Sequence, residues 1–282
     1  MKKVISFFLL VVTILSIGCL PVFANELTVL DMEQYLINQG IPQSYLDSLI
    51  EEEIQNLYSD LCDKKICYQG TQIIKGLSES HSPDQIQPLG TIGSDYLTLS
   101  LTYISNIEYD SSVKKNRIIE TYVYLNYHWT KLPAISRQDP IAINWDPSVF
   151  TFKSNSFNHK DYGYYDYNNS WKVDHETTTP TLLEQCGMGY LADISGLSGR
   201  GHSGAVYPSD VKGTTEFTLL PQSRMYQDNG QNTTSINVNY THNKDPFGWF
   251  NPSFSVSGVG ININFAGFKD SMAISKNFYY SR

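Results

Sequence analysis

The chain has 282 residues, of which 28 are acidic and 20 are Lys or Arg, and its formal net charge is −8. Nucleic-acid binding depends on clustered Lys and Arg, so this balance argues against a nucleic-acid partner and against simple electrostatic attachment to anionic lipid. The 20 tyrosines are the unusual feature, because tyrosine suits pleated, half-buried surfaces and also stacks on sugars or partner proteins.

The N-terminus has the organisation of a secretory leader. A short basic start precedes an apolar run over residues 4–17, and Val22-Phe23-Ala24 offers small residues before a cleavage point. We therefore expect residues 1–24 to be a signal peptide and the protein to be secreted. An alternative is left open by Ser16-Ile17-Gly18-Cys19, which resembles a lipobox: acylated Cys19 would anchor the protein on the outer face of the membrane.

A helical hairpin is predicted within residues 25–77. Thr28 and Asp31 have the spacing of a capping box, and Gly40 ends the first helix. Pro42 opens a second helix, whose apolar residues repeat on one stripe as far as Leu61. We expect the pair to pack against the rest of the chain or against a partner.

Three cysteines follow the leader: Cys62, Cys67 and Cys186. Outside the cytoplasm a disulfide is permitted, and Cys62 can reach Cys67 if the helix ends between them. A Cys62–Cys67 disulfide is the prediction, and a link from either residue to Cys186 is the alternative. The spacings do not fit a zinc site, and we expect neither a metal nor another cofactor.

The remainder of the chain is predicted to form strands after a polar linker at residues 78–93. Leu97 to Tyr109 and Ile119 to Thr130 alternate apolar and polar residues, and the polar segment between them predicts an antiparallel hairpin. Further alternating segments recur every ten or so residues. The predicted fold class is therefore mainly β, an antiparallel β-sandwich over residues 94–282 behind a short N-terminal helical hairpin.

The alternation of apolar and polar residues changes phase in the last part of this region. Phe254 and Val256 occupy even positions, whereas Ile261 and Phe265 occupy odd ones, with Gly258 and Gly260 at the junction. Such a change predicts one strand, from Ser253 to Phe265, that contains a β-bulge.

Catalytic motifs are incomplete. Gly199 to Gly204 matches GxGxxG, but no helix pattern follows it. His175-Glu176 begins like HExxH, yet Thr179 stands where the second histidine belongs. A secreted hydrolase would instead bring His128, His175 or His202 into a cleft beside Ser, Asp or Glu.

Two aromatic clusters are candidate binding sites. The segment from Lys160 to Trp171 is too polar and turn-rich for a core strand, and its rings alternate with carboxylates and amides that suit sugar binding. A proline-bracketed tip at residues 246–252 is suited to a membrane interface or an apolar partner. The candidate residues are Tyr162, Tyr164, Tyr165, Tyr167 and Trp171 in the first cluster, and Phe247, Trp249 and Phe250 in the second.

The segments from Trp129 to Pro133 and from Asp139 to Asp146 resemble parts of secreted, functionally uncharacterised proteins of Gram-positive bacteria. This resemblance implies export and a β-rich body. It carries over no activity and no catalytic residue.

The first functional hypothesis is a secreted or envelope-associated, non-catalytic binding protein, with a cell-envelope glycan or another protein as its partner. The alternative is a membrane-active or pore-forming β-protein that uses the late strands and the tip at residues 246–252. A secreted hydrolase is the third.

Overall fold

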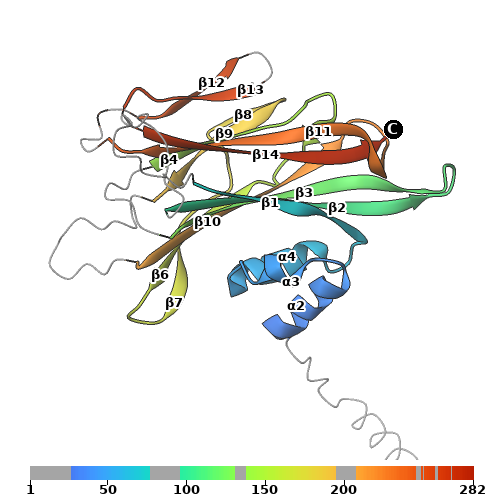
Figure 1. The fold of residues 1–282 in the computed structure, drawn as a ribbon, viewed down its shortest axis with the longest axis horizontal. Helices are drawn as coiled ribbons and strands as arrows, with labels where there is room; N and C mark the ends of the chain where they lie inside the picture. The colour runs from blue at the N-terminus through green and yellow to red at the C-terminus, as the bar shows by residue number, and fades with distance from the viewer. Residues whose placement is uncertain are drawn as a thin grey trace, which may run out of the picture.

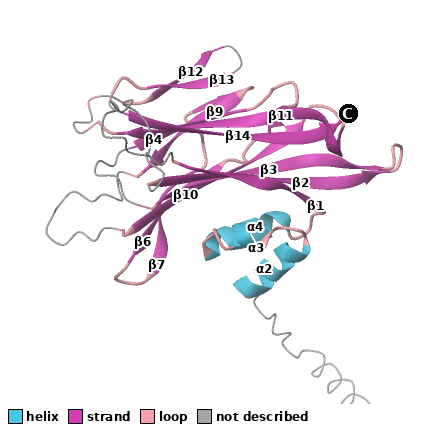
Figure 2. Cartoon of the chain, in the orientation of Figure 1, coloured by secondary structure: helices cyan, strands magenta, loops and turns pink. Residues whose placement is uncertain are grey.

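The computed structural model describes residues 27–76, 96–130, 138–194, 208–245, 249, 251–257, 260–267 and 269–282. Within these ranges, antiparallel strands form a two-layered body, and helices cover the outside of one layer (Figure 1). The helices are α2 (Val29–Asn38), α3 (Gln43–Leu46) and α4 (Glu51–Leu61). The strands are β1 (Ile66–Lys75), β2 (Leu97–Asp110), β3 (Lys115–Trp129), β4 (Gln138–Asn144), β5 (Phe150–Phe152), β6 (Asn158–Tyr165), β7 (Ser170–Thr177), β8 (Leu182–Glu184), β9 (Gly187–Asp193), β10 (Asp210–Pro221), β11 (Met225–Asn243), β12 (Ser253–Ser257), β13 (Gly260–Asn264) and β14 (Lys269–Ser281). The predicted fold class is confirmed: strands dominate and the helices are few and short (Figure 2).

The two layers belong to one sheet that folds over on itself. The first layer has the strand order β1-β2-β3-β10-β6-β7, and the second has β14-β11-β4-β9-β8. The layers join where the start of β11 pairs with β3, before β11 continues alongside β4. β12 and β13 form a separate hairpin that contacts β4 and β9.

The main core lies between the layers. β2 and β3 form the predicted long hairpin, which ends where Asp110 pairs with Lys115. Tyr103 and Val123, on the apolar parity of these strands, are fully buried and belong to one cluster with Ile236 and Phe278 of the second layer. Full burial of such a side chain stabilises the fold by about 1.5–3 kcal/mol.

A smaller core fixes the helices to the outer face of the first layer. Leu46, Leu57 and Leu61 belong to one buried cluster with Ile104 and Tyr122 of the sheet. α2 begins with the predicted capping box, in which the Thr28 hydroxyl accepts from the Asp31 N–H and the Asp31 carboxylate accepts from the Thr28 N–H.

The predicted helix from Pro42 to Leu61 is interrupted. Ser48 Oγ donates to the carbonyl oxygen of Tyr45 at 2.6 Å, and Ile50 adopts an extended backbone before α4 begins. The Glu53 carboxylate then accepts from the Ile50 N–H at 2.7 Å, which satisfies one of the free donors at a helix start. The break therefore holds Glu53 on the side of α4 that faces the sheet, where it also accepts from Thr214.

The helical region ends well before the predicted boundary at residue 77. β1 pairs with β2 from Ile66 opposite Asn106 to Lys75 opposite Thr98. β1 thereby covers an edge of β2 whose backbone groups would otherwise lack partners. The predicted signal peptide and linker, and with them Cys19, lie outside the described residues.

The predicted Cys62–Cys67 disulfide is wrong, since Cys62, Cys67 and Cys186 are all free. The Cys62 thiol, at the end of α4, lies 3.8 Å from the carbonyl oxygen of Ser59. The Cys67 thiol, on β1, accepts from Gln227 Nε2 at 2.9 Å. The helix end and the strand start direct the two sulfurs to different neighbours, and the alternative link to the buried Cys186 is not formed either.

The single bulged strand predicted from Ser253 to Phe265 is instead a hairpin of β12 and β13. Ser253 pairs with Asn264, and Ser257 pairs with Gly260. The change of phase in the sequence therefore marks a two-residue connection between antiparallel strands.

Candidate functional site

The outer face of the first layer is polar where the helices approach it. Directly paired residues of neighbouring strands share a face, so three rows of side chains cross β3, β10 and β6. The rows are Tyr124-Glu216-Asn158, Asn126-Thr214-Lys160 and His128-Lys212-Tyr162. An outward sheet face is usually wetted by solvent, but here α3 and α4 lie over part of it.

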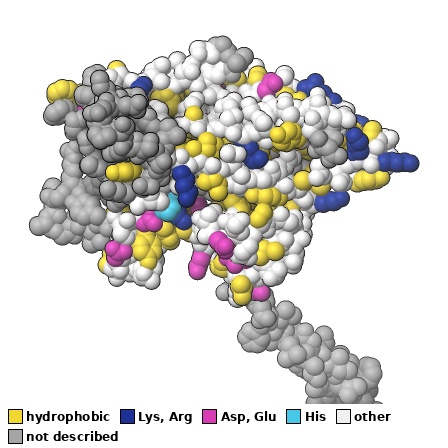
Figure 3. Space-filling view, viewed as in Figure 1, with side chains coloured by type: hydrophobic (Ala, Val, Ile, Leu, Met, Phe, Trp, Pro, Cys, Tyr) yellow, Lys and Arg dark blue, Asp and Glu magenta, His cyan; other side chains and the backbone are white. Residues whose placement is uncertain are grey.

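We call the space between this face and the helices the helix–sheet groove. One part of it is a cavity of about 300 Å³, which is within the size range of small-molecule sites. A space of about 20 Å³ under α4 adjoins it and shares Tyr45, Glu53 and Asn126. On the molecular surface a notch separates the helices from the lobe of β6 and β7, and charged side chains lie along it (Figure 3).

Hydroxyl groups and tyrosine rings line the larger cavity. The rings of Tyr45 and Tyr68 lie 6.2 Å apart between their centres, and the Asn126 amide adds a donor and an acceptor. Tyrosine faces pack against C–H groups, while hydroxyls and amides exchange hydrogen bonds, so this lining suits a polyhydroxylated molecule. The hydroxyl side chains are Ser44, Ser48, Thr71, Thr98 and Ser100.

Two basic side chains complete the lining. Lys212 Nζ donates to the carbonyl oxygen of Ser48 at 3.1 Å and lies 5.1 Å from the centre of the Trp171 ring. His128 Nε2 lies 2.7 Å from Asp210 Oδ1. Lys212 therefore connects the cavity with the aromatic side chains of the β6–β7 hairpin.

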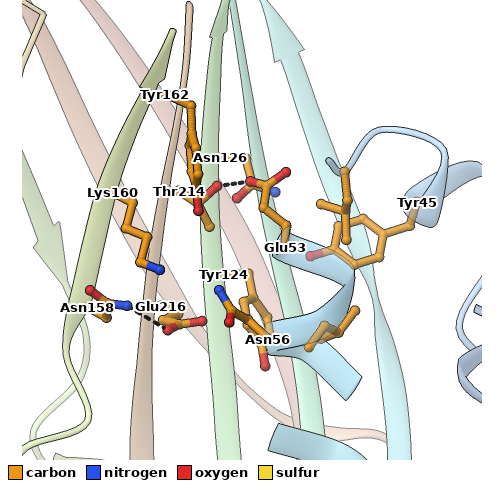
Figure 4. A pocket seen from close by; sticks show the side chains of 12 residues that line it. Tyr45, Glu53, Asn56, Tyr124, Asn126, Asn158, Lys160, Tyr162, Thr214 and Glu216 are labelled. Carbon is orange, nitrogen blue, oxygen red and sulfur yellow. Dashed lines mark hydrogen bonds between the residues drawn. The ribbon is translucent and has the colours of Figure 1, made fainter. Parts of the chain in front are cut away.

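Glu53 is the buried carboxyl group of the helix–sheet groove. It is 6% exposed and accepts hydrogen bonds from the Ile50 N–H and the Thr214 hydroxyl, the second of which is visible in Figure 4. Burial raises the pKa of Glu53 to about 7, against the opposing effects of the Ile50 N–H and the charge of Lys212. The Glu53 carboxyl group therefore changes from protonated to ionised near neutral pH.

Glu216 is a second carboxyl group in the space under α4 (Figure 4). Burial raises the pKa of Glu216, and Asn158 Nδ2 donates to it at 3.1 Å. Lys160, in the neighbouring row, forms a salt bridge with Glu52, with its Nζ 2.6 Å from Glu52 Oε1. The charges in this part of the groove are thus held by neighbouring side chains.

The first predicted aromatic cluster is divided between the faces of the β6–β7 hairpin. Tyr162 is 1% exposed and lines the space under α4, so the expectation that this segment is too polar for burial is wrong. Tyr164 and Trp171 pair across the strands on the same face, with ring centres 5.4 Å apart. Tyr165 points the other way and contacts Tyr167, with ring centres 5.8 Å apart. Tyr162, Tyr164 and Trp171 therefore lie on the groove face.

The second predicted cluster is described only at Trp249, which is 74% exposed. Phe247 and Phe250 lie outside the described residues, as does His202. Among the helices in the described ranges, none has the length and apolar character needed to cross a membrane.

A separate polar cluster lies on the opposite face of β6, inside the sandwich. Asp161 is fully buried, with His159 Nε2 2.9 Å from its Oδ1 and His175 Nδ1 3.0 Å from its Oδ2. The Tyr127 hydroxyl and the Asp193 N–H also donate to this carboxylate. Burial raises the pKa of Asp161, but the charge of His159 and the hydrogen bonds outweigh it and hold the pKa well below its usual range. Within the described ranges, His159, Asp161 and His175 have the donor atoms of a metal site.

A β-bulge brings His175 into this cluster. Tyr162 pairs with Val173, whereas Asp161 pairs with His175, so Asp174 is an extra residue in β7. If β7 continued in the register of Tyr162 and Val173, His175 would lie opposite Lys160 on the groove face. The His-x-Asp spacing at 159 and 161 was a readable signal, because alternate residues of a strand share a face. The histidine next to His175 is His159, on the neighbouring strand.

A second buried aspartate has one imidazole neighbour instead of two. Asp139 accepts from the Tyr240 hydroxyl at 2.5 Å, from the Asn243 N–H at 2.9 Å and from His242 Nδ1 at 3.0 Å. Here burial prevails over these partners and raises the pKa of Asp139.

Comparison with known proteins identifies no family. No family model and no curated protein matches the sequence. The chain is similar to the collagen-binding domain of a Staphylococcus aureus adhesin, at 8% identity and a TM-score of 0.28, over 55% of this chain and 87% of that one. It is also similar to the collagen binding subdomain of the Enterococcus faecalis surface protein ACE, at 9% identity and a TM-score of 0.22, over 56% and 88% of the two chains. Similarities of this size carry no argument about ligand or activity.

Proposed function

We propose that this protein is an exported, non-catalytic binding protein whose helix–sheet groove holds a saccharide. The observation that carries the proposal is the cavity of about 300 Å³ lined by hydroxyl groups and tyrosine rings. Saccharides present hydroxyls at their edges and C–H groups on their faces, and both have counterparts in this lining. The predicted leader supports a location where the protein meets the glycans of cell envelopes.

The aromatic residues on the groove face support a ligand longer than one sugar. Lys212 lines the cavity and also lies over Trp171, which contacts Tyr164. A second sugar leaving the cavity past Lys212 would meet these rings. Tyr164 and Trp171 therefore belong to the proposed site, whereas the buried Tyr162 and the outward Tyr165 and Tyr167 do not.

Titration calorimetry with a panel of soluble neutral and N-acetylated oligosaccharides tests the proposal. Ser100→Phe places a ring in the cavity, and we expect it to weaken binding at least about tenfold. Ser275→Phe makes the same change on an exposed position of β14 in the other layer, and we expect unchanged affinity. Absence of binding to every member of the panel, or equal losses in the two variants, would contradict the proposal.

A glycoside hydrolase is the second candidate, because Glu53 and Glu216 line one groove and burial raises the pKa of both. Glycosidases use one protonated and one ionised carboxyl group. Release of reducing ends from a bound oligosaccharide, abolished by Glu53→Gln with binding retained, would favour this candidate. Binding without any release would favour the non-catalytic protein.

A further inference from the structure

We propose that His159, Asp161 and His175 bind a divalent transition-metal ion of the zinc class. The three side chains come from facing positions of β6 and β7, on the face of the hairpin opposite to the helix–sheet groove. Two imidazoles and one carboxylate are a donor set that zinc takes in proteins. The inference is independent of the saccharide proposal, because the two sites share none of these side chains.

The donor atoms are close enough for one ion. One atom from each residue lies within 4.8 Å of the other two, whereas zinc–ligand distances of about 2.0–2.2 Å put tetrahedral ligands roughly 3.3 Å apart. His159 and Asp161 are fully buried, so their positions are fixed by packing. The His175 side chain is 33% exposed and already lies with its Nδ1 3.0 Å from Asp161 Oδ2.

The hydrogen bonding of His159 fits a ligand. Its Nδ1 lies 2.9 Å from Thr215 Oγ1, and the same hydroxyl contacts the Tyr190 hydroxyl. Metal-bound histidines usually donate their second N–H to an oxygen in this way, which leaves the other nitrogen with its lone pair. His159 Nε2 is buried and makes no hydrogen bond, because it is not aligned with the nearby Asp161 oxygen.

The surroundings of Asp161 also fit a ligating carboxylate. The Tyr127 hydroxyl donates to Oδ1, and the Asp193 N–H donates to Oδ2 at 2.8 Å. These donors hold the carboxylate in place while leaving lone pairs for an ion. Since His175 is half-buried at the edge of the sandwich, water can complete the coordination from that side.

Calorimetry and Co²⁺ absorption on chelator-treated full-length protein test the inference. We expect one equivalent of Zn²⁺ to bind, Co²⁺ to give the visible bands of a tetrahedral site, and Zn²⁺ but not Mg²⁺ to raise the melting temperature. His175→Gln removes a half-exposed ligand from a folded scaffold and should weaken Zn²⁺ binding by at least about a hundredfold, more than loss of an outer-shell partner costs.

His128→Gln is the matched control, because His128 is 34% exposed and also pairs with an aspartate. We expect it to bind Zn²⁺ as the unmodified protein does. Equal losses in the two variants would mean adventitious binding to surface imidazoles and would overturn the inference. Absence of Zn²⁺ binding by the unmodified protein would overturn it as well, whatever the outcome of the oligosaccharide titrations.

Discussion

Asp161 and Glu53 are both buried carboxyl groups, yet their environments move their pKa values in opposite directions. Asp161, inside the sandwich, lies between two imidazoles, and its pKa is held well below the usual range. Glu53, in the helix–sheet groove, has no imidazole partner, and burial raises its pKa to about 7. Depth alone therefore does not decide the charge of a buried acid. The charges and hydrogen bonds that surround the acid decide as well.

Asp139 is the intermediate case. It has one imidazole, from His242, and its pKa is raised by burial despite that partner. The partners of Asp139 thus do not offset its loss of hydration, whereas those of Asp161 do. Single substitutions test this series of three carboxyl groups.

Asp161→Asn should have the largest effect. In chelator-treated protein we expect the free energy of unfolding in urea to fall by about 3–5 kcal/mol, because the buried donors around the carboxylate lose their charged acceptor. Asp210→Asn is the control: its carboxylate is 35% exposed beside His128, and the cost should stay below about 1 kcal/mol. Similar losses of unfolding free energy in the two variants would show that the buried aspartate contributes no more to stability than the half-exposed one.

Glu53→Gln should stabilise the protein at alkaline pH. A carboxyl group whose pKa rises from 4.5 to about 7 on folding leaves stability intact below pH 4.5 and lowers it by about 3 kcal/mol once ionised above pH 7. The charged groups that act on it are Lys212, Glu52 and Glu216. We therefore expect the variant to exceed the unmodified protein by up to about 3 kcal/mol at about pH 8, and not at about pH 4, in urea titrations.

Glu52→Gln is the control for this pH dependence, because Glu52 is 39% exposed and pairs with Lys160 at the rim. It should give no gain in stability at alkaline pH, because it removes a carboxylate that pairs with Lys160. If Glu53→Gln gave no gain at alkaline pH, the carboxyl group would be ionised at little cost, and the contrast with Asp161 would disappear.

Tyr240→Phe should have a moderate effect. The Tyr240 hydroxyl donates to Asp139 and accepts from Trp129 Nε1 at 3.1 Å, so its loss removes one hydrogen bond from each of two buried groups and costs about 2 kcal/mol. Tyr127→Phe removes one of four groups around Asp161 and should cost less. Thermal unfolding of the two variants measures both losses. A larger loss in Tyr127→Phe than in Tyr240→Phe would contradict the expected order.

Glu108→Ala should have the smallest effect. Glu108 is 68% exposed and pairs with Arg117 at 3.0 Å on the β2–β3 hairpin. Exposed pairs contribute less than about 1 kcal/mol, and salt screens them further. Denaturation at low and high salt measures the loss, and a cost comparable with that of Asp161→Asn would remove the distinction between buried and exposed acids.

Local patterns in the sequence predicted the parts of the fold that local physics determines. The alternation in Leu97 to Tyr109 and Ile119 to Trp129 fixes which side chains enter the core, and the Thr28–Asp31 spacing fixes a helix start. Both depend on residues close together in the chain. The position of Glu53 against Thr214 and the extra residue at Asp174 depend on contacts with other strands, so no local pattern predicted them.

The candidate site was predicted only in part for the same reason. Tyr162, Tyr164 and Trp171 were identified from composition, but the sequence did not separate them from Tyr165 and Tyr167, because that depends on which face the helices cover. Glu53 carried no signal at all, since its burial follows from the interruption of the helix. The proximity of His159 and His175 required the strand pairing itself.

β6 carries Lys160 and Tyr162 toward one site and His159 and Asp161 toward the other. Sliding this strand by a single residue would exchange the two sets, leaving a lysine and a tyrosine in the interior and a histidine and an aspartate beneath the helices. Point substitutions can alter either site alone, whereas insertions and deletions taken up by β6 would destroy both together.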